Sequence, residues 1–301
     1  MFAMFDYVEF SKYLSDGYYD DSRISHFNEL TDKYSSMKVI YNKEKKMLTV
    51  RGSLAYFVQG HNFWFDVKGV EKAVDRLSEL LGVDLYDAKV NIIEYGVVVR
   101  PNFSMEEFIN SHLRTRGYEE ITYDIRGKKY VRKDKSYTLK FYSLWANIDN
   151  SRNKVSTEIR EMLKNSCCGR EYNPIRYEIH GNVQKILGVG KVFVSDLLST
   201  EFEELFKQVL LKKYKQIKKW ERINISGMRK CDSLVIVLAL LSEKEKRYQE
   251  RILANIDTLN AKEDAKLSRK TFFRNKFGQV PREKCSYSIE KLIIEAFEKD
   301  E

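Results

Sequence analysis

The sequence contains little proline and little glycine, 3 and 14 among 301 residues. A flexible linker rich in these residues is therefore not expected, and no internal repeat or low-complexity tract is present. Long apolar runs are also missing. The longest, residues 233–241, is far too short to span a bilayer, and the first residues lack the basic flank and apolar core of a signal peptide. These absences predict an intracellular protein without a membrane partner.

Cysteines are few and poorly spaced for metal binding. The four are Cys167, Cys168, Cys231 and Cys285, with no CxxC pair and no histidine nearby. The sequence therefore indicates neither a structural zinc site nor a disulfide framework.

Basic residues are in excess, with 53 Lys and Arg against 44 Asp and Glu, a net charge of +9. Residues 1–36 hold seven acids and three bases, so the rest of the chain carries a net charge of +13. Such a charge favours a polyanionic partner, although it says nothing about chemistry.

Hydrophobic periodicity predicts an α+β fold with a mostly antiparallel central sheet flanked by helices. We expect an acidic N-terminal segment (residues 1–36), an α+β domain (37–222) and a helical C-terminal module (223–301). The expected strands are 38–41, 47–59, 62–67, 89–99, 119–125, 129–132, 137–142 and 175–180. The expected helices are 70–81, 104–113, 155–164, 193–198, 200–220, 231–241, 243–256 and 267–278.

Two of the expected strands carry chemically useful side chains on one face. Alternation places Arg176, Glu178 and His180 together in the strand at 175–180, and Lys140 and Tyr142 together in the strand at 137–142. A carboxylate and an imidazole side by side form either a pair of cation ligands or an acid/base pair. If the strands are neighbours, these five side chains share one surface.

Glu94 interrupts an otherwise apolar strand at residues 89–99. An unpaired buried carboxylate costs several kcal/mol, so a partner must compensate it. One interpretation is an ion pair with an arginine such as Arg176. The other is a site in which Glu94, Glu178 and His180 hold Mg²⁺ or Mn²⁺, because carboxylates with open water positions suit hard cations.

Basic residues gather in two later segments. The run at 206–222 is either a solvated helix face or a phosphate track. The run at 267–278 is typical of a helix-turn-helix recognition helix, with Ser268 as its cap and Gly278 as its end. The residues predicted to contact DNA are Arg176, Lys207, Lys212, Lys213, Lys215, Arg269, Lys270, Arg274 and Lys276.

Five short runs, in this order and at these spacings, resemble the rolling-circle replication initiators of small plasmids and single-stranded-DNA phages, including the Rep_trans plasmid initiators. The resemblance covers roughly residues 38–220. The runs are RGSLA (51–55), LSELL (77–81), KVNIIEY (89–95), LKFY (139–142) and IRYEIH (175–180).

The resemblance implies a metal-dependent endonuclease and strand transferase that nicks and rejoins one DNA strand at a replication origin. Tyr142 takes the place of the nucleophile that forms a 5′-phosphotyrosyl bond, and Glu94, Glu178 and His180 take the places of the ligands of Mg²⁺ or Mn²⁺. It further implies double- and single-stranded origin DNA, host helicase and polymerase, and a second copy of the chain as partners, in the cytoplasm of a bacterial host cell.

The sequence departs from the family after Tyr142. Ser143, Leu144 and Trp145 stand where an acid or amide and a lysine are usual, and Lys140 is the expected catalytic substitute for that lysine. The alternative hypothesis is therefore an origin-binding or regulatory DNA-binding protein of the same fold without chemistry.

Overall fold

The fold is seen in a computed structural model of the chain. It divides into two compact units, Met1–Ile109 with Gly117–Gln216 and Ile289–Glu301, and Asn110–Arg116 with Ile217–Ser288. The structure describes residues 3–14, 22–25, 27, 36–63, 65–123, 126–148, 156–158, 160–161, 174–219, 222–223, 252–257, 262–279, 282–283 and 288–298.

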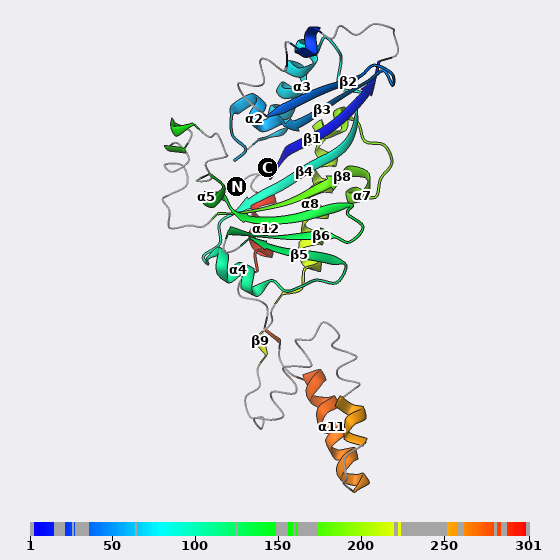
Figure 1. Ribbon diagram of the computed structural model, residues 1–301. Helices are drawn as coiled ribbons and strands as arrows, with labels where there is room; N and C mark the ends of the chain where they lie inside the picture. Colours follow the sequence, from blue (N-terminus) through cyan, green and yellow to red (C-terminus); the bar gives the residue numbers. More distant parts are fainter. Residues whose placement is uncertain are drawn as a thin grey trace. The chain divides into compact units, whose positions relative to one another are not determined.

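The first unit is built on an antiparallel sheet in which eight strands are described, in the order β2-β3-β1-β4-β8-β7-β6-β5 (Figure 1). The predicted α+β class with a mostly antiparallel sheet is confirmed. The strands are β1 (Ala3–Tyr13), β2 (Met37–Asn42), β3 (Met47–Ser53), β4 (Lys89–Val99), β5 (Tyr118–Tyr123), β6 (Gly127–Arg132), β7 (Tyr137–Ser143) and β8 (Ile175–Asn182).

The sequence predicted a separate acidic segment at residues 1–36, but the first part of it belongs to the sheet. Ala3–Tyr13 forms β1, which lies inside the sheet and pairs with both β3 and β4. Its pairing with β4 shifts register between Phe5 and Val8 and again between Glu9 and Phe10. Such bulges break the strict alternation of side chains, which is why the segment showed weak periodicity.

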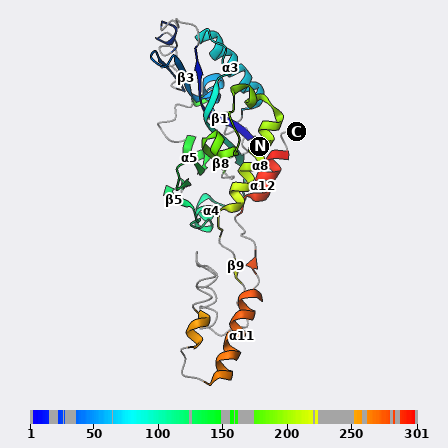
Figure 2. The ribbon, with the colours of Figure 1, turned by 90° about the vertical axis from the view of Figure 1, so that its right-hand side faces the viewer.

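One face of the sheet forms the core with two helices, α8 (Thr200–Gln216) and α12 (Glu290–Glu298). Figure 2 shows these helices on one side of the sheet and α5 (Leu144–Ile148) on the other. The Tyr177 hydroxyl donates to the carbonyl of Leu210 at 2.9 Å, and the ring of Tyr177 stacks on Phe141 with centroids 4.4 Å apart. Burial of these aromatic side chains stabilises the sheet against α8.

The segment after β3 is helical, and the predicted strands at 47–59 and 62–67 were wrong beyond Ser53. Helix α2 (Leu54–Gln59) begins where the Ser53 hydroxyl accepts from the amide of Tyr56. It ends at Gly60, which has the left-handed φ of 75° that glycine tolerates. The serine cap and the glycine stop were readable signals that the β-rich composition of the segment concealed.

Other helices follow the predictions more closely. Helix α3 (Val67–Leu81) ends at Gly82 as expected, and α4 (Met105–Ser111) begins with the predicted capping box between Ser104 and Glu107. Further short helices are α7 (Val183–Leu187) and the 3-10 helix η2 (Val194–Leu198). The helix expected at 155–164 lies largely outside the described residues, as do those expected at 231–241 and 243–256.

The second unit contains α11 (Glu263–Gln279) and a short pairing of β9 (Arg222–Ile223) with β10 (Arg282–Glu283). Its boundaries differ from the predicted module at 223–301, because residues 110–116 belong to it and α12 returns to the first unit. Leu113 donates to the carbonyl of Lys218 at 2.8 Å, which explains why these distant residues group together. No described helix is both long enough and apolar enough to cross a membrane.

Candidate functional site

The strands that carry the predicted site residues are neighbours in the sheet. Strand β8 lies between β4 and β7, with Glu94 opposite His180, Lys140 opposite Glu178, and Tyr142 opposite Arg176. Directly opposed residues in antiparallel strands point to the same face. The expectation that these side chains share one face is therefore confirmed, and that face is the one turned away from α8.

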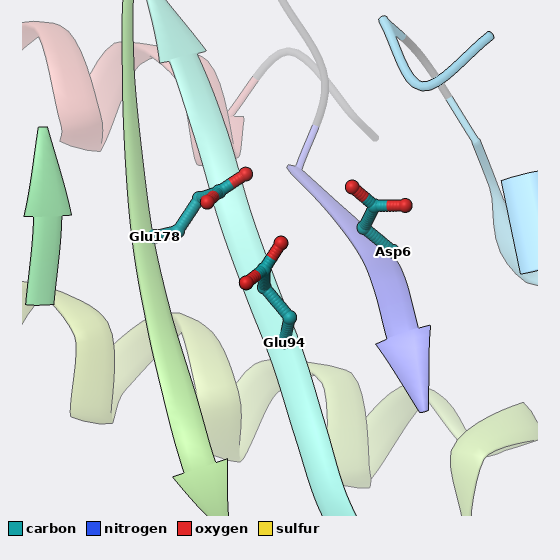
Figure 3. Close-up of side chains that lie close together, drawn as sticks. All are labelled: Asp6, Glu94 and Glu178. Carbon is teal, nitrogen blue, oxygen red and sulfur yellow. The ribbon is translucent and has the colours of Figure 1, made fainter. Parts of the chain in front are cut away.

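Three carboxylates meet on this face. Asp6, Glu94 and Glu178 are buried, and each offers an oxygen within 4.8 Å of the others (Figure 3). The ligand set predicted from the sequence was Glu94, Glu178 and His180, so Asp6 stands where His180 was expected. Asp6 follows Phe5 in β1, at the first register shift between β1 and β4. Clustered carboxylate oxygens are the ligands that hard divalent cations prefer.

Arg176 is an internal cation and not the predicted DNA contact. Its side chain is 1% exposed, it lies 3.0 Å from Asp6, and it also forms an ion pair with Glu178. It further donates to the carbonyl of Asn62. A buried guanidinium with carboxylates on two sides cannot reach a phosphate backbone, so this prediction was wrong. Alternation gave the correct face for Arg176 but could not reveal Asp6 as its partner.

Glu94 is compensated by Lys140 and His180, not by the ion pair with Arg176 that one interpretation expected. Lys140 forms an ion pair with Glu94 and lies 3.8 Å from Glu178. His180 Nδ1 lies 3.2 Å from Glu94 Oε2. Burial opposes the charged form of Lys140, but Glu178 and Glu94 outweigh it and raise the pKa of the lysine. Lys140 therefore stays charged between the two glutamates.

Tyr142 donates its hydroxyl hydrogen to Glu178 Oε1 at 2.7 Å. The ring is partly exposed, whereas the hydroxyl lies among the charged groups. Burial raises the pKa of Tyr142 well above its usual value, and Glu178 and Glu94 act in the same direction against Arg176. Burial also raises the pKa of Glu178, to about 7, although Arg176 opposes the shift. The phenol is therefore neutral and hydrogen-bonded to a carboxyl group that titrates close to neutral pH.

Two glycines make room for this arrangement. Gly96 lies opposite Glu178, and a Cβ at position 96 would come within 2.7 Å of the Glu178 side chain. Gly127 lies opposite Tyr142, and a Cβ there would come within 2.6 Å of the carbonyl of Phe141. Glycine inside a strand often marks such a close approach, so these two glycines are a signal of the site that the sequence carries.

A cavity of about 350 Å³ opens over these groups. Its floor and walls include all three carboxylates, Lys140 and Tyr142. Asn62, Tyr123, Arg126, Gly127, Ser143 and Ala146 complete the lining. The volume falls at the lower end of the range for small-ligand pockets, roughly 300–1,000 Å³. Tyr142 and its hydrogen-bond partner Glu178 therefore line the same cavity.

The predicted lysine track on α8 lies on the helix that covers the opposite face of the sheet. Lys207 lies 3.5 Å from Glu203, Lys213 sits 4.9 Å over the ring of Tyr137, and Lys215 lies 3.6 Å from Glu290. Lys212 is exposed. None of these four lines the cavity. Contacts between this helix and DNA stay a prediction.

The predicted recognition helix is part of α11, which begins at Glu263 and runs to Gln279, beyond the expected limits Ser268 and Gly278. Arg269 and Arg274 are exposed there, Phe273 is buried, and Lys270 pairs with Asp257. Lys276 also lies within the helix. DNA reading by α11 stays a prediction.

No model of a known protein family matches the sequence, and a comparison with curated proteins finds no match. The resemblance to rolling-circle initiators therefore stays an expectation carried by the five sequence runs. The site combines a tyrosine hydroxyl with an acceptor carboxylate, a charged lysine and a set of oxygen ligands, within one open cavity.

Proposed function

We propose that this protein is a site-specific DNA strand transferase that nicks and rejoins one strand through a phosphotyrosyl intermediate, as in the initiation of rolling-circle replication of a plasmid or phage. The observation that carries the proposal is the 2.7 Å hydrogen bond from Tyr142 to Glu178 inside a cavity that also holds Lys140. A nucleophile hydrogen-bonded to a base is the arrangement that covalent catalysis requires.

The reaction balances with groups of this chain and water. The Tyr142 oxygen attacks the phosphorus of a phosphodiester, and its proton passes to Glu178. The bond from phosphorus to the 3′ oxygen breaks, and that oxygen takes a proton from water. The hydroxide that remains takes the proton from Glu178, which restores the carboxylate and the water. The result is a 5′-phosphotyrosyl bond and a free 3′ hydroxyl. Attack by a 3′ hydroxyl on the phosphotyrosyl bond reverses these steps and returns the proton to Tyr142.

Lys140 provides positive charge at the place where the attacked phosphate gains negative charge. It is the cation of β7 closest to Tyr142 on the same face, and it keeps its proton because two glutamates surround it. This position supports the prediction that Lys140 replaces the lysine that usually follows the tyrosine and is missing after Tyr142. Arg176 holds Glu178 from the other side and fixes the acceptor oxygen next to the phenol.

We also propose that Glu94 and Glu178, with Asp6, hold Mg²⁺ or Mn²⁺. The donors fit a hard cation because all are carboxylates within 4.8 Å of one another. Asp6 already accepts from Ser53, Asn62 and Arg176, and Glu178 is held by Tyr142 and Arg176. The contacts of Glu94 with Lys140 and His180 both involve Oε2, so Glu94 Oε1 is the oxygen most open to a cation. When bound, the cation would polarise a phosphoryl oxygen and offset developing charge.

DNA binding without chemistry is the second candidate. It is favoured by the raised pKa of Tyr142, because a neutral phenol is a weak nucleophile. The two candidates differ in one measurable product, the covalent adduct.

To test for this adduct, a single-stranded oligonucleotide library carrying origin sequences is incubated with the protein and Mg²⁺ or Mn²⁺, and denaturing gels report covalent species. We expect an adduct that is lost in Tyr142→Phe and reduced about 100-fold or more in Glu178→Ala. Phenylalanine keeps the ring but removes the attacking oxygen, so DNA binding should survive.

Tyr137→Phe is the matched control. Its hydroxyl bonds to Tyr118 at 2.8 Å, and α8 packs against its ring on the opposite face. It should leave adduct formation unchanged. An adduct that persists in Tyr142→Phe would assign the nucleophile elsewhere, first to Tyr7, whose ring lies 5.5 Å from that of His180. Absence of any adduct with every substrate and metal would favour the binding-only candidate.

A further inference from the structure

The hairpin formed by β5 and β6 brings a second tyrosine to the site. In the register of the sheet, Arg176, Tyr142, Gly127 and Tyr123 lie side by side on four successive strands. Tyr123 therefore points to the same face as Tyr142, with Gly127 between them. Two strand spacings, about 10 Å, separate the backbones that carry the two tyrosines.

Tyr123 is free to take part in binding. Its side chain is 52% exposed, although it is large and apolar, and it lines the cavity that contains Tyr142. An exposed aromatic ring at the wall of a cavity offers a flat face on which a ligand ring can stack. Packing within the described core does not explain its position.

Arg126 stands at the same edge of the cavity. It is exposed, and within the described part of the chain it forms no ion pair. The other cations near the cavity differ in this respect, because Lys140 and Arg176 are both held by glutamates. Arg126 is thus a positive charge available to an incoming anion.

We infer that Tyr123 and Arg126 form a subsite for one nucleotide of single-stranded DNA, in which the base stacks on Tyr123 and a backbone phosphate contacts Arg126. The inference rests on the proposed function for its substrate class. An aromatic ring paired with a guanidinium is how proteins hold single strands, since each base offers a flat face and each phosphate a charge. A cavity of about 350 Å³ suits one nucleotide beside the scissile phosphate. A base inside a duplex is stacked on both faces and cannot enter.

The test measures binding by fluorescence anisotropy in the Tyr142→Phe protein, which keeps the full chain and removes chemistry. Two labelled probes of about 12 nucleotides are compared, an oligothymidylate and a strand of abasic residues. We expect Tyr123→Ala to weaken oligothymidylate binding about 5- to 100-fold and to leave the abasic strand unchanged. Tyr123→Phe should bind both like the parent, because the stacking face is kept.

Arg126→Gln should act on both probes alike. Losing one phosphate contact should lower the slope of log affinity against log salt by about 0.7 for a single strand. Tyr13→Ala and Lys68→Ala serve as matched controls, since Tyr13 is 72% exposed at the end of β1 and Lys68 is exposed on α3. Neither should change affinity or slope. Thermal unfolding of each variant confirms that the fold is kept.

Equal binding of both probes by Tyr123→Ala and its parent would overturn the subsite, as would duplex binding with the same dependence on Tyr123. These results are independent of the covalent test. An adduct formed without any role of Tyr123 would leave the proposed function standing and remove the subsite. Binding that depends on Tyr123 in a protein that never forms an adduct would support the subsite and contradict the proposed function.

Discussion

Glu178 is the residue on which the site converges, because four different neighbours are fitted to it. Gly96 leaves space for its side chain, Arg176 and Lys140 balance its charge, and Tyr142 donates to it. Its exposure is 1%. A carboxylate this deeply buried is tolerated only when its partners are all in place. The side chain of Glu178 therefore constrains the residues at all four neighbouring positions.

His61 gives the fold a dependence on pH. It is 5% exposed, and burial lowers its pKa to about 4. Because the folded state disfavours the charged ring, its contribution to stability is complete above pH 6.5 and is lost as pH falls toward 4. We expect the free energy of unfolding to drop by about 1–2 kcal/mol over this range, after allowing for solvent screening. Chemical denaturation at several pH values measures it.

His61→Gln separates this effect from the titration of carboxylates. The difference in unfolding free energy between the two proteins should change between pH 6.5 and 4 and be constant above pH 6.5. A constant difference over the whole range would contradict the assignment. Ring NMR signals of the four histidines report the same pKa directly.

At the scale of elements, β1 decides whether the site is complete. It supplies Asp6 and stands between β3 and β4, and Arg176 joins it to β8. We expect Arg176→Met to lower the free energy of unfolding by about 3–5 kcal/mol, because Asp6 and Glu178 are then buried beside an apolar side chain. Urea denaturation followed by circular dichroism measures the loss.

The double variant Asp6→Asn with Arg176→Met is the control for this pair. It removes one of the stranded charges, so its cost should be smaller than the sum of the two single costs. Additive costs would mean that the two side chains are not coupled, and a cost below 1 kcal/mol for Arg176→Met would contradict the role given to the buried arginine.

The sequence predicted those parts of the site that lie on regular strands. Strands β7 and β8 alternate around their polar residues, so parity placed Lys140, Tyr142, Glu178 and His180 on one face. Glu94 was found in another way, as a carboxylate that interrupts the apolar strand β4. Asp6 was not predicted as a site residue, because the bulge after Phe5 breaks the alternation that identifies a strand. Pairing across the sheet could not be predicted either, since the insertion of β1 between β3 and β4 is not encoded in local periodicity.

At the scale of the whole molecule, the chain leaves the first unit at residue 216 and returns to it at residue 289. The two points are close, because the amide of Ile289 donates to the Tyr214 hydroxyl at 2.8 Å. Replacing residues 217–288 by a short Gly/Ser linker should therefore keep the sheet folded, with its near-UV circular dichroism and a cooperative thermal transition. Loss of the cooperative transition would show that the first unit needs the second.

That replacement also separates two sources of DNA affinity. If the shortened protein keeps binding of single strands that depends on Tyr123, the first unit is sufficient for it. Deleting α12 instead is the matched control. That helix buries Ile293 and Ala296 in the first unit, so its removal should unfold the sheet.

The pairing of Asp6 with Arg176 joins residues 170 positions apart in the chain. On a ribosome, β1 is made first and yet cannot acquire its charged partner until β8 has been synthesised and has entered the sheet. Contacts between such distant residues close late and slow folding. The carboxylates, the lysine and the tyrosine therefore come together only after most of the first unit exists, and a truncated nascent chain carries no assembled site.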